Sequence, residues 1–507
     1  MFDNPIFLSI RLIFQLRNFY QKYLSNMKFK ILSHAGMMVE SHGKTLLFDP
    51  WLVGSCYWRS WWNFPEIDRA EIKDIKPDFI YLTHLHWDHF HAPSLRLFDR
   101  EVTYLVPKIP GTRMVRDLKS CKFNNIVEIG HGDKFELWEN CFLHSFQFGL
   151  FAADSVAVLS DGETTLLNAN DCKTFGLPLK QITNRFPKVD FCFRSHSSAT
   201  PIPYTIKDYK EKFPELRTAQ QYVDEFTSFS LAVGAKYAVP FASNHCFLHK
   251  ETVQFNDTGV NPQMVADFYN SDPQAKAQKS ECVIMVPGSS WDRRTGFDLK
   301  TFDYSRKDEI IVEMQAKYAD KLEQQYEKEE KTKASFKAFE RYFRNFLNSV
   351  PRLVRKKLLP KLVFKVEDAD GEHLWLLDAP NNKIEELNES VYSDIVIRVP
   401  AIVINDCVRR KMFSVWSASK RLEIELNDDQ GLSKLQGLLG FLDFYENEGL
   451  PLKTNFSRRN LPIWLSRWRE AVEAVRLVFV YKILRRKFVI SELYTNGKKA
   501  PASLSEA

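Results

Sequence analysis

The sequence predicts an α/β protein in which a large domain of alternating strands and helices precedes a smaller α+β domain. Two observations support this prediction. Short apolar segments typical of strands alternate with helical patterns between residues 27 and 304, which indicates sheets covered by helices. The chain also has 507 residues, about three times the size of a typical domain, so we expect two or three domains.

The elements of the large domain follow from local patterns. Apolar runs bounded by turn residues predict strands over Lys28–His34, Met38–Ser41, Thr45–Phe48, Phe79–Thr83, Val102–Val106, Ser155–Ser160 and Thr164–Asn168. Apolar residues at helical spacing predict helices over Ala92–Leu97 and Ala219–Val233.

The rest of the chain divides by composition. Residues 305–350 are rich in Lys, Glu and Gln and predict a charged helical connector. Residues 351–450 predict the smaller α+β domain, and residues 451–507 a basic, aromatic helix and tail. Residues 1–26 predict an amphipathic helix. Because both ends combine basic and aromatic residues, peripheral contact with an anionic membrane is an alternative to packing on the protein itself.

Composition excludes several classes of protein. Hydrophobic residues make up 44% and charged residues 26%, which excludes a mainly disordered chain, a collagen-like chain and a polytopic membrane protein. A net charge of +6 over this length is too small to indicate nucleic-acid binding. The eight cysteines form no Cys-x-x-Cys pair, so we expect reduced thiols and a cytoplasmic location.

The strongest chemical signal is a cluster of histidines and one aspartate directly after a predicted strand. His84 and His86, two residues apart, can hold one metal ion, while Asp88 and His89 can face a second. Imidazole with carboxylate suits Zn, Fe or Mn. Asp171 ends a later strand, where its carboxylate can bridge the two ions. With 12 histidines in the whole chain, a chance surface cluster is a poor alternative.

This arrangement resembles the metallo-β-lactamase superfamily, whose mark is HxHxDH after a strand followed by an aspartate at the end of a later strand. The resemblance implies an αββα sandwich over residues 27–304 and two divalent ions, with zinc expected and iron as the alternative. Within the superfamily, Phe48–Leu52 and Trp61-Trp62 are similar to the branch that contains CMP-N-acetylneuraminate hydroxylase. That hydroxylase carries a Rieske iron–sulfur domain, and this chain has no Cys-x-His pair to provide its ligands.

The resemblance implies further ligands but leaves their identity open. His144 is the nearest candidate for the third histidine, and a structural role for it is the alternative. His245 and His249 compete for the last ligand position. Arg194 and His196 are candidates for the substrate cleft, because Arg194 can meet a phosphate or carboxylate unless it forms a structural ion pair.

Three functions follow from these residues. The first is a metal-dependent hydrolase that activates water against a phosphoester, lactone or amide, with Asp88 as the catalytic residue. The second is a di-iron oxygenase that acts on a sugar nucleotide or a related substrate with a separate reductase. The third is a metal-stabilised lipid carrier, because residues 393–426 are similar to sterol-carrier-protein-2-like domains. In each case the partner is a small molecule, and Trp61 is a candidate for the mouth of its cleft.

Overall fold

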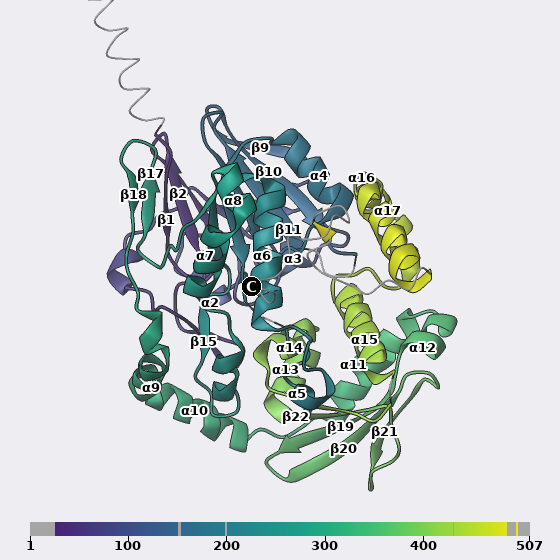
Figure 1. Ribbon diagram of the computed structural model, residues 1–507. Helices are drawn as coiled ribbons and strands as arrows, with labels where there is room; N and C mark the ends of the chain where they lie inside the picture. The colour runs from purple at the N-terminus through teal and green to yellow at the C-terminus, as the bar shows by residue number, and fades with distance from the viewer. Residues whose placement is uncertain (1–25, 151–153, 198–199, 429, 484–492, 495–507) are drawn as a thin grey trace, which may run out of the picture.

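The computed structural model describes residues 26–150, 154–197, 200–428, 430–483 and 493–494 (Figure 1). The amphipathic helix predicted over residues 1–26 lies outside them, apart from its last residue. None of the described helices is both long and apolar enough to cross a membrane.

Two β-sheets lie face to face in the larger unit of the chain (Figure 1). The first sheet has eight strands, in the order β18 (Gly296–Asp298), β17 (Ser290–Asp292), β1 (Lys28–Ile31), β2 (Met37–Ser41), β3 (Lys44–Phe48), β6 (Phe79–Tyr81), β7 (Thr103–Pro107) and β8 (Ile126–Ile129). The second has seven, in the order β16 (Glu281–Cys282), β14 (Ala235–Phe241), β13 (Val189–Ser195), β12 (Thr165–Asn170), β11 (Asp154–Ser160), β10 (Cys141–Phe148) and β9 (Lys134–Trp138).

Aromatic and aliphatic side chains from both sheets form one core between them. Phe29 of β1 meets Phe191 and Phe193 of β13 edge to face, with ring centroids 4.9 and 5.3 Å apart. The outer face of the first sheet is covered by α2 (Ala92–Leu95) and α3 (Arg113–Ser120). The outer face of the second is covered by α4 (Gly176–Arg185), α6 (Ala219–Val233) and α7 (Pro262–Ser271). The layers are therefore those of an αββα sandwich, which confirms the predicted fold class.

The order of strands brings several strand ends to one edge of the sandwich. β3 and β6 are parallel neighbours, with Phe48 opposite Tyr81, so the residues that follow them lie side by side. β12, β13 and β14 are also parallel to one another. Loops at the carboxyl ends of parallel strands commonly carry binding groups. The first strand ends at Ile31, earlier than predicted, because residues 32–36 form the turn into β2.

The smaller unit contains a five-stranded sheet. Its strands run in the order β21 (Lys383–Leu387), β20 (Gly371–Asp378), β19 (Lys361–Asp368), β22 (Ile395–Pro400) and β23 (Glu423–Leu426). The helices that pack with it are α11 (Phe336–Ser349), α13 (Ala401–Arg410), α14 (Ser414–Ser419) and α15 (Gly431–Glu446). The preceding helices, α9 (Lys307–Lys317) and α10 (Ala319–Glu330), connect the two units.

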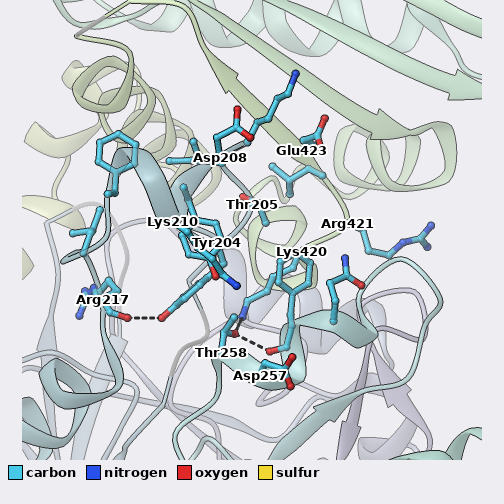
Figure 2. Close-up of a pocket in the computed structure, with 18 of the residues that line it drawn as sticks. Tyr204, Thr205, Asp208, Lys210, Arg217, Asp257, Thr258, Lys420, Arg421 and Glu423 are labelled. Atoms are coloured by element: carbon cyan, nitrogen blue, oxygen red, sulfur yellow. Dashed lines mark hydrogen bonds between the residues drawn. The ribbon is translucent and has the colours of Figure 1, made fainter.

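The two units share one core and enclose a cleft. Tyr57, Trp58 and Trp61 of the larger unit pack in the same hydrophobic cluster as the sheet and helices of the smaller one. Beside this contact lies a cavity of about 1090 Å³, lined by Tyr204 and Arg217 on one side and by residues 420–423 on the other (Figure 2).

The basic aromatic segment near the C-terminus forms two helices instead of the single one predicted. α16 (Asn460–Ser466) ends at Arg467, and α17 (Trp468–Leu477) begins directly after it. At this boundary the Arg467 side chain is buried and binds Glu470 and the carbonyl oxygen of Gly149. Large apolar side chains of this segment are exposed, including Leu465, Trp468 and Val475. Contact with a membrane surface stays a prediction.

Candidate metal centre

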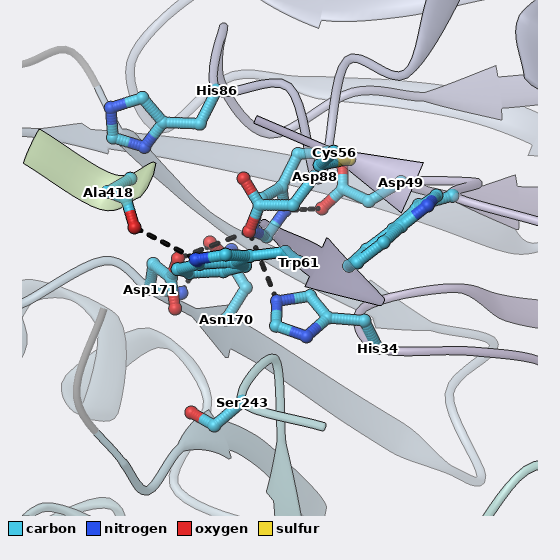
Figure 3. A network of polar contacts seen from close by, with 12 residues as sticks. His34, Asp49, Cys56, Trp61, His86, Asp88, Asn170, Asp171, Ser243 and Ala418 are labelled. Atoms are coloured by element: carbon cyan, nitrogen blue, oxygen red, sulfur yellow. Dashed lines mark hydrogen bonds and ion pairs between the residues drawn. The ribbon is translucent and has the colours of Figure 1, made fainter. Parts of the chain in front are cut away.

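The histidine cluster lies at the edge where the parallel strands end (Figure 3). His84 Nε2 lies 2.9 Å from His86 Nδ1. His89 Nε2 lies 3.4 Å from Asp88 Oδ2 and 3.3 Å from Asp171 Oδ2, so it faces both carboxylates. The sandwich thus brings together all five residues of the HxHxDH and strand-end pattern, although 82 positions separate His89 from Asp171.

The donor atoms are close enough to hold cations. Ligand atoms of His84, His89 and Asp171 all lie within 4.8 Å of one another. Those of Asp88, His89 and a further residue, His34, do so as well. Buried imidazoles with carboxylates are the donor set that Zn and Fe prefer, so these residues fit a metal centre.

Asp49 fixes the orientation of the cluster from behind. It follows β3, and its Oδ1 accepts a hydrogen bond from the backbone N–H of Thr83 at 2.8 Å. Its Oδ2 accepts one from the Thr83 hydroxyl at 2.7 Å and lies 2.9 Å from His89 Nδ1. A histidine that binds a metal through one ring nitrogen commonly donates a hydrogen bond from the other nitrogen to a carboxylate, which fixes the orientation of the ring. Asp49 therefore turns His89 Nε2 toward Asp88 and Asp171.

Charges in the cluster are tightly coupled. Burial and, to a smaller extent, the neighbouring His89 lower the pKa of His84 to about 4. Burial also lowers the pKa of His89, but Asp88 and Asp49 together raise it well above its usual value. Three carboxylates around one imidazole make a strongly anionic pocket, which is the electrostatic environment of a cation site.

Two side chains that sequence reasoning missed also belong to this cluster. His34 lies in the turn between β1 and β2, and its Nε2 is 3.1 Å from Asp88 Oδ2. Its Nδ1 has no hydrogen-bond partner among the described residues. Asp154, the first residue of β11, has a carboxylate oxygen 4.0 Å from His84 Nδ1. Burial raises the pKa of Asp154 to about 6, although His86 counteracts this effect.

Tyr57 holds Asp88 from the side of the smaller unit. Its hydroxyl donates a hydrogen bond to Asp88 Oδ1, and its ring stacks on Trp87 in the same loop as His84, His86 and His89. Asp88 is 2% exposed, so both of its oxygens are committed to neighbouring groups: Tyr57 on one side, His34 and His89 on the other.

The further histidines that were candidate ligands from the sequence lie at different distances from the cluster. The His245 ring stacks on Trp61, with centroids 3.6 Å apart, and lies 5.4 Å from the ring of His34. His249 instead pairs with Glu329 of α10, with its Nε2 3.4 Å from the carboxylate. His144 packs against Phe186 at the end of α4, on the outer side of β10. The structure brings His245 and Trp61 to the cluster, but not His249 or His144.

The two polar candidates for the substrate cleft also differ. His196 follows β13, is 1% exposed, and has no hydrogen-bond partner for either ring nitrogen among the described residues. Arg194 is fully buried and bound on several sides by the Cys172 carbonyl oxygen, Glu225 and the Tyr494 hydroxyl. The Arg194 guanidinium is therefore used by a structural ion pair.

The ion pairs of Glu225 predict a pH dependence of stability. Burial raises its pKa, but Lys173, Arg194 and Arg217 lower it from 4.5 to about 2. The folded protein thus holds the carboxylate more strongly than the unfolded chain, and this stabilisation is present above pH 4.5 and lost as the pH falls to 2. We expect Glu225→Gln to lower the free energy of unfolding at pH 7 by about 3 kcal/mol. Denaturation at several pH values should show the difference shrinking in acid, and parallel profiles would contradict it.

The fold and the motif together define this unit as a metallo-β-lactamase fold. No protein-family model matches the sequence. A Mycobacterium tuberculosis protein, provisionally named a Rieske 2Fe-2S iron-sulfur protein, is 29% identical over 280 residues, 52% of each chain. The cytidine monophosphate-N-acetylneuraminic acid hydroxylase of Mus musculus is 33% identical over 102 residues, 20% of this chain and 17% of that one. The chain spans about half the length of the first of these relatives.

Similarity to solved structures is weaker. The di-iron β-hydroxylase CmlA from Streptomyces venezuelae is 15% identical, with a TM-score of 0.37 over 53% of this chain and 54% of that one. An isothiocyanate hydrolase from Delia radicum gut bacteria is 14% identical, with a TM-score of 0.37 over 52% of this chain and 98% of that one. At these scores the likeness adds nothing to the fold described above.

Proposed function

We propose that the protein is an enzyme that depends on two adjacent metal ions. The observation that supports this most directly is the convergence of His84, His86, Asp88, His89 and Asp171 in one anionic pocket, where His84, Asp88 and His89 are buried. The contact between the Asp49 carboxylate and His89 Nδ1 also supports the proposal, because a histidine oriented in this way is typical of a metal ligand.

The side chains divide between two positions. We propose that His84 and His86 would hold one ion together with Asp171, and that His34, Asp88 and His89 would hold the other. Two such ions, when bound, supply Lewis acidity and acidify water at neutral pH. Asp88 accepts a hydrogen bond from the Tyr57 hydroxyl, which fixes the direction of its carboxylate in this pocket.

Between the two reactions predicted from the sequence, we favour an oxygen-dependent hydroxylase. Imidazole and carboxylate donors suit iron as well as zinc, and the histidines and aspartates of the cluster provide such a set. The sequence relatives are hydroxylases or proteins named for iron–sulfur centres, which supports the same choice. The overall reaction consumes the substrate, O2, two electrons and two protons, and yields the hydroxylated product and water. A separate reductase provides the electrons.

A hydrolase is the second candidate. The carboxylate of Asp88 lies among Tyr57, His34 and His89, so it would hold the ion that acidifies the attacking water. The substrate in either case is a small molecule. A nucleotide sugar is the first to test, because the Mus musculus relative is named for one. The lipid-carrier alternative receives no support from the smaller unit, whose core is filled by aromatic side chains such as Phe343, Phe364 and Trp375.

Metal identity tests the proposal. We expect the protein, purified without added metal under anaerobic conditions, to contain about two iron ions per chain and to change its absorption on exposure to O2. Elemental mass spectrometry and a spectrum before and after oxygenation measure both. About two zinc ions without an oxygen response would favour the hydrolase instead, and a metal-free protein would contradict a metal-dependent enzyme.

A further inference from the structure

A short segment of the smaller unit inserts beside the candidate metal centre. Residues 418–421, at the end of α14, are all buried. The Trp61 indole N–H donates to the Ala418 carbonyl oxygen at 2.8 Å, and the Ser60 hydroxyl donates to that of Ser419 at 2.7 Å. Since Trp61 also stacks on His245, the smaller unit forms a wall of the pocket that contains the cluster.

Lys420 of this segment is a buried cation. It is 2% exposed, and its Nζ donates to the Thr258 hydroxyl at 3.2 Å. The ammonium lies 4.8 to 5.4 Å from the ring centroids of Tyr204, Phe247 and Phe255. Among the described residues no carboxylate forms an ion pair with it, whereas the adjacent Arg421 binds both Glu251 and Glu329. Burial lowers the pKa of Lys420 to about 7. A buried charge without a counter-ion is costly, and the cost is removed when an anion binds.

Lys420 also lies between two spaces. On one side is the cleft of about 1090 Å³ between the units, large enough for a ligand of nucleotide size (Figure 2). On the other is a chamber of about 50 Å³ lined by His196, His245 and Lys420. Phe213 and Leu216 add apolar surface to the large cleft, so a ligand there combines an anionic group with a ring or an acyl chain.

We propose that Lys420 binds the anionic group of the substrate, a phosphate or a carboxylate, in this cleft. The inference rests on the proposed function insofar as the bound molecule is the substrate of the metal centre. The aromatic rings and the Thr258 hydroxyl, which itself donates to the Phe255 carbonyl oxygen, hold the Lys420 ammonium in place. The smaller unit therefore has a function in substrate binding, which explains why residues 418–421 reach so far into the larger unit.

Binding of phenyl phosphate and of benzoate tests this proposal, with phenol as the neutral reference. We expect calorimetric titration to show binding of one or both anions to the purified protein. Lys420→Met should weaken it at least about tenfold, because the hydrogen bond to a charged group is lost. The control is Lys210→Met, which removes an exposed lysine from the same cleft and should change binding by less than about twofold. Lys420→Met should also raise Tm, because it removes an uncompensated buried charge.

The outcomes separate this proposal from the metal-dependent function. Equal binding by the wild type and Lys420→Met, equal losses in both lysine variants, or no binding of either anion would overturn the anion site. Repeating the titration on His84→Ala/His86→Ala shows whether the metal centre contributes to binding. If that double variant binds the anion and Lys420→Met does not, the anion site stands even where no metal is found.

Discussion

Replacing His84 and His86 together by alanine is expected to remove metal from the protein and to abolish metal-dependent activity. His84 Nε2 and His86 Nδ1 lie 2.9 Å apart. The two imidazoles supply two of the three protein ligands proposed for one ion. An ion left with Asp171 alone has too few donors to stay bound. Asp171 also faces His89 of the neighbouring position at 3.3 Å, so the occupancy of that position should fall as well. Elemental mass spectrometry of the variant and the wild type measures the loss.

The matched control is His144→Ala. This residue was a candidate ligand from the sequence, but its ring packs against Phe186 on the outer side of β10. The variant should keep its metal and lose only the packing of one buried ring. Metal retained by His84→Ala/His86→Ala at the wild-type level would contradict the proposed centre. If His144→Ala also lost metal, His144 would have to be counted among the metal ligands.

The sequence predicts those site residues that lie close together in one short segment. His84, His86, Asp88 and His89 follow one strand, and their spacing alone indicates a metal-binding loop. Asp171 could be predicted because it ends a strand of the same domain. The sandwich itself followed from the alternation of strands and helices, together with the resemblance that the motif carries.

The other site residues are brought together by pairing between strands that are distant in the sequence, and no local sequence pattern indicates such pairing. His34 is a single histidine in a turn, and only the antiparallel pairing of β1 with β2 and β2 with β3 brings it to the edge where β6 ends. Asp154 begins β11 and looks like any polar residue beside a hairpin. Lys420 is 331 positions from His89, and nothing in the sequence shows that its segment inserts beside His245. Side chains of this kind become visible only once the sheets and the two units are assembled.

Asp49→Asn is expected to weaken metal binding about 10- to 100-fold while the fold is kept, because loss of a partner that orients a ligand typically has this effect. The backbone N–H of Thr83 requires an oxygen acceptor at the Oδ1 position, so the new amide nitrogen occupies the Oδ2 position. There it faces His89 Nδ1, which then has to accept a hydrogen bond instead of donating one. In a neutral imidazole the proton moves to Nε2, the atom that faces Asp88 and Asp171. The variant thus blocks a ligand without removing it.

Asp49→Asn is expected to lower the affinity for metal without lowering the stability of the fold. Asp78→Asn is the matched control: Asp78 precedes β6 and accepts a hydrogen bond from the Thr45 backbone N–H at 2.9 Å, at the opposite end of the same strand pair. It should bind metal like the wild type, with only the loss of an exposed contact to Lys44. Competition with a chelator of known affinity measures binding, and thermal denaturation of the chelated proteins measures stability. If Asp49→Asn binds metal as tightly as Asp78→Asn, His89 is not a ligand through Nε2. If it loses stability as well as metal, the carboxylate of Asp49 acts on the fold of the loop and not only on the direction of one imidazole.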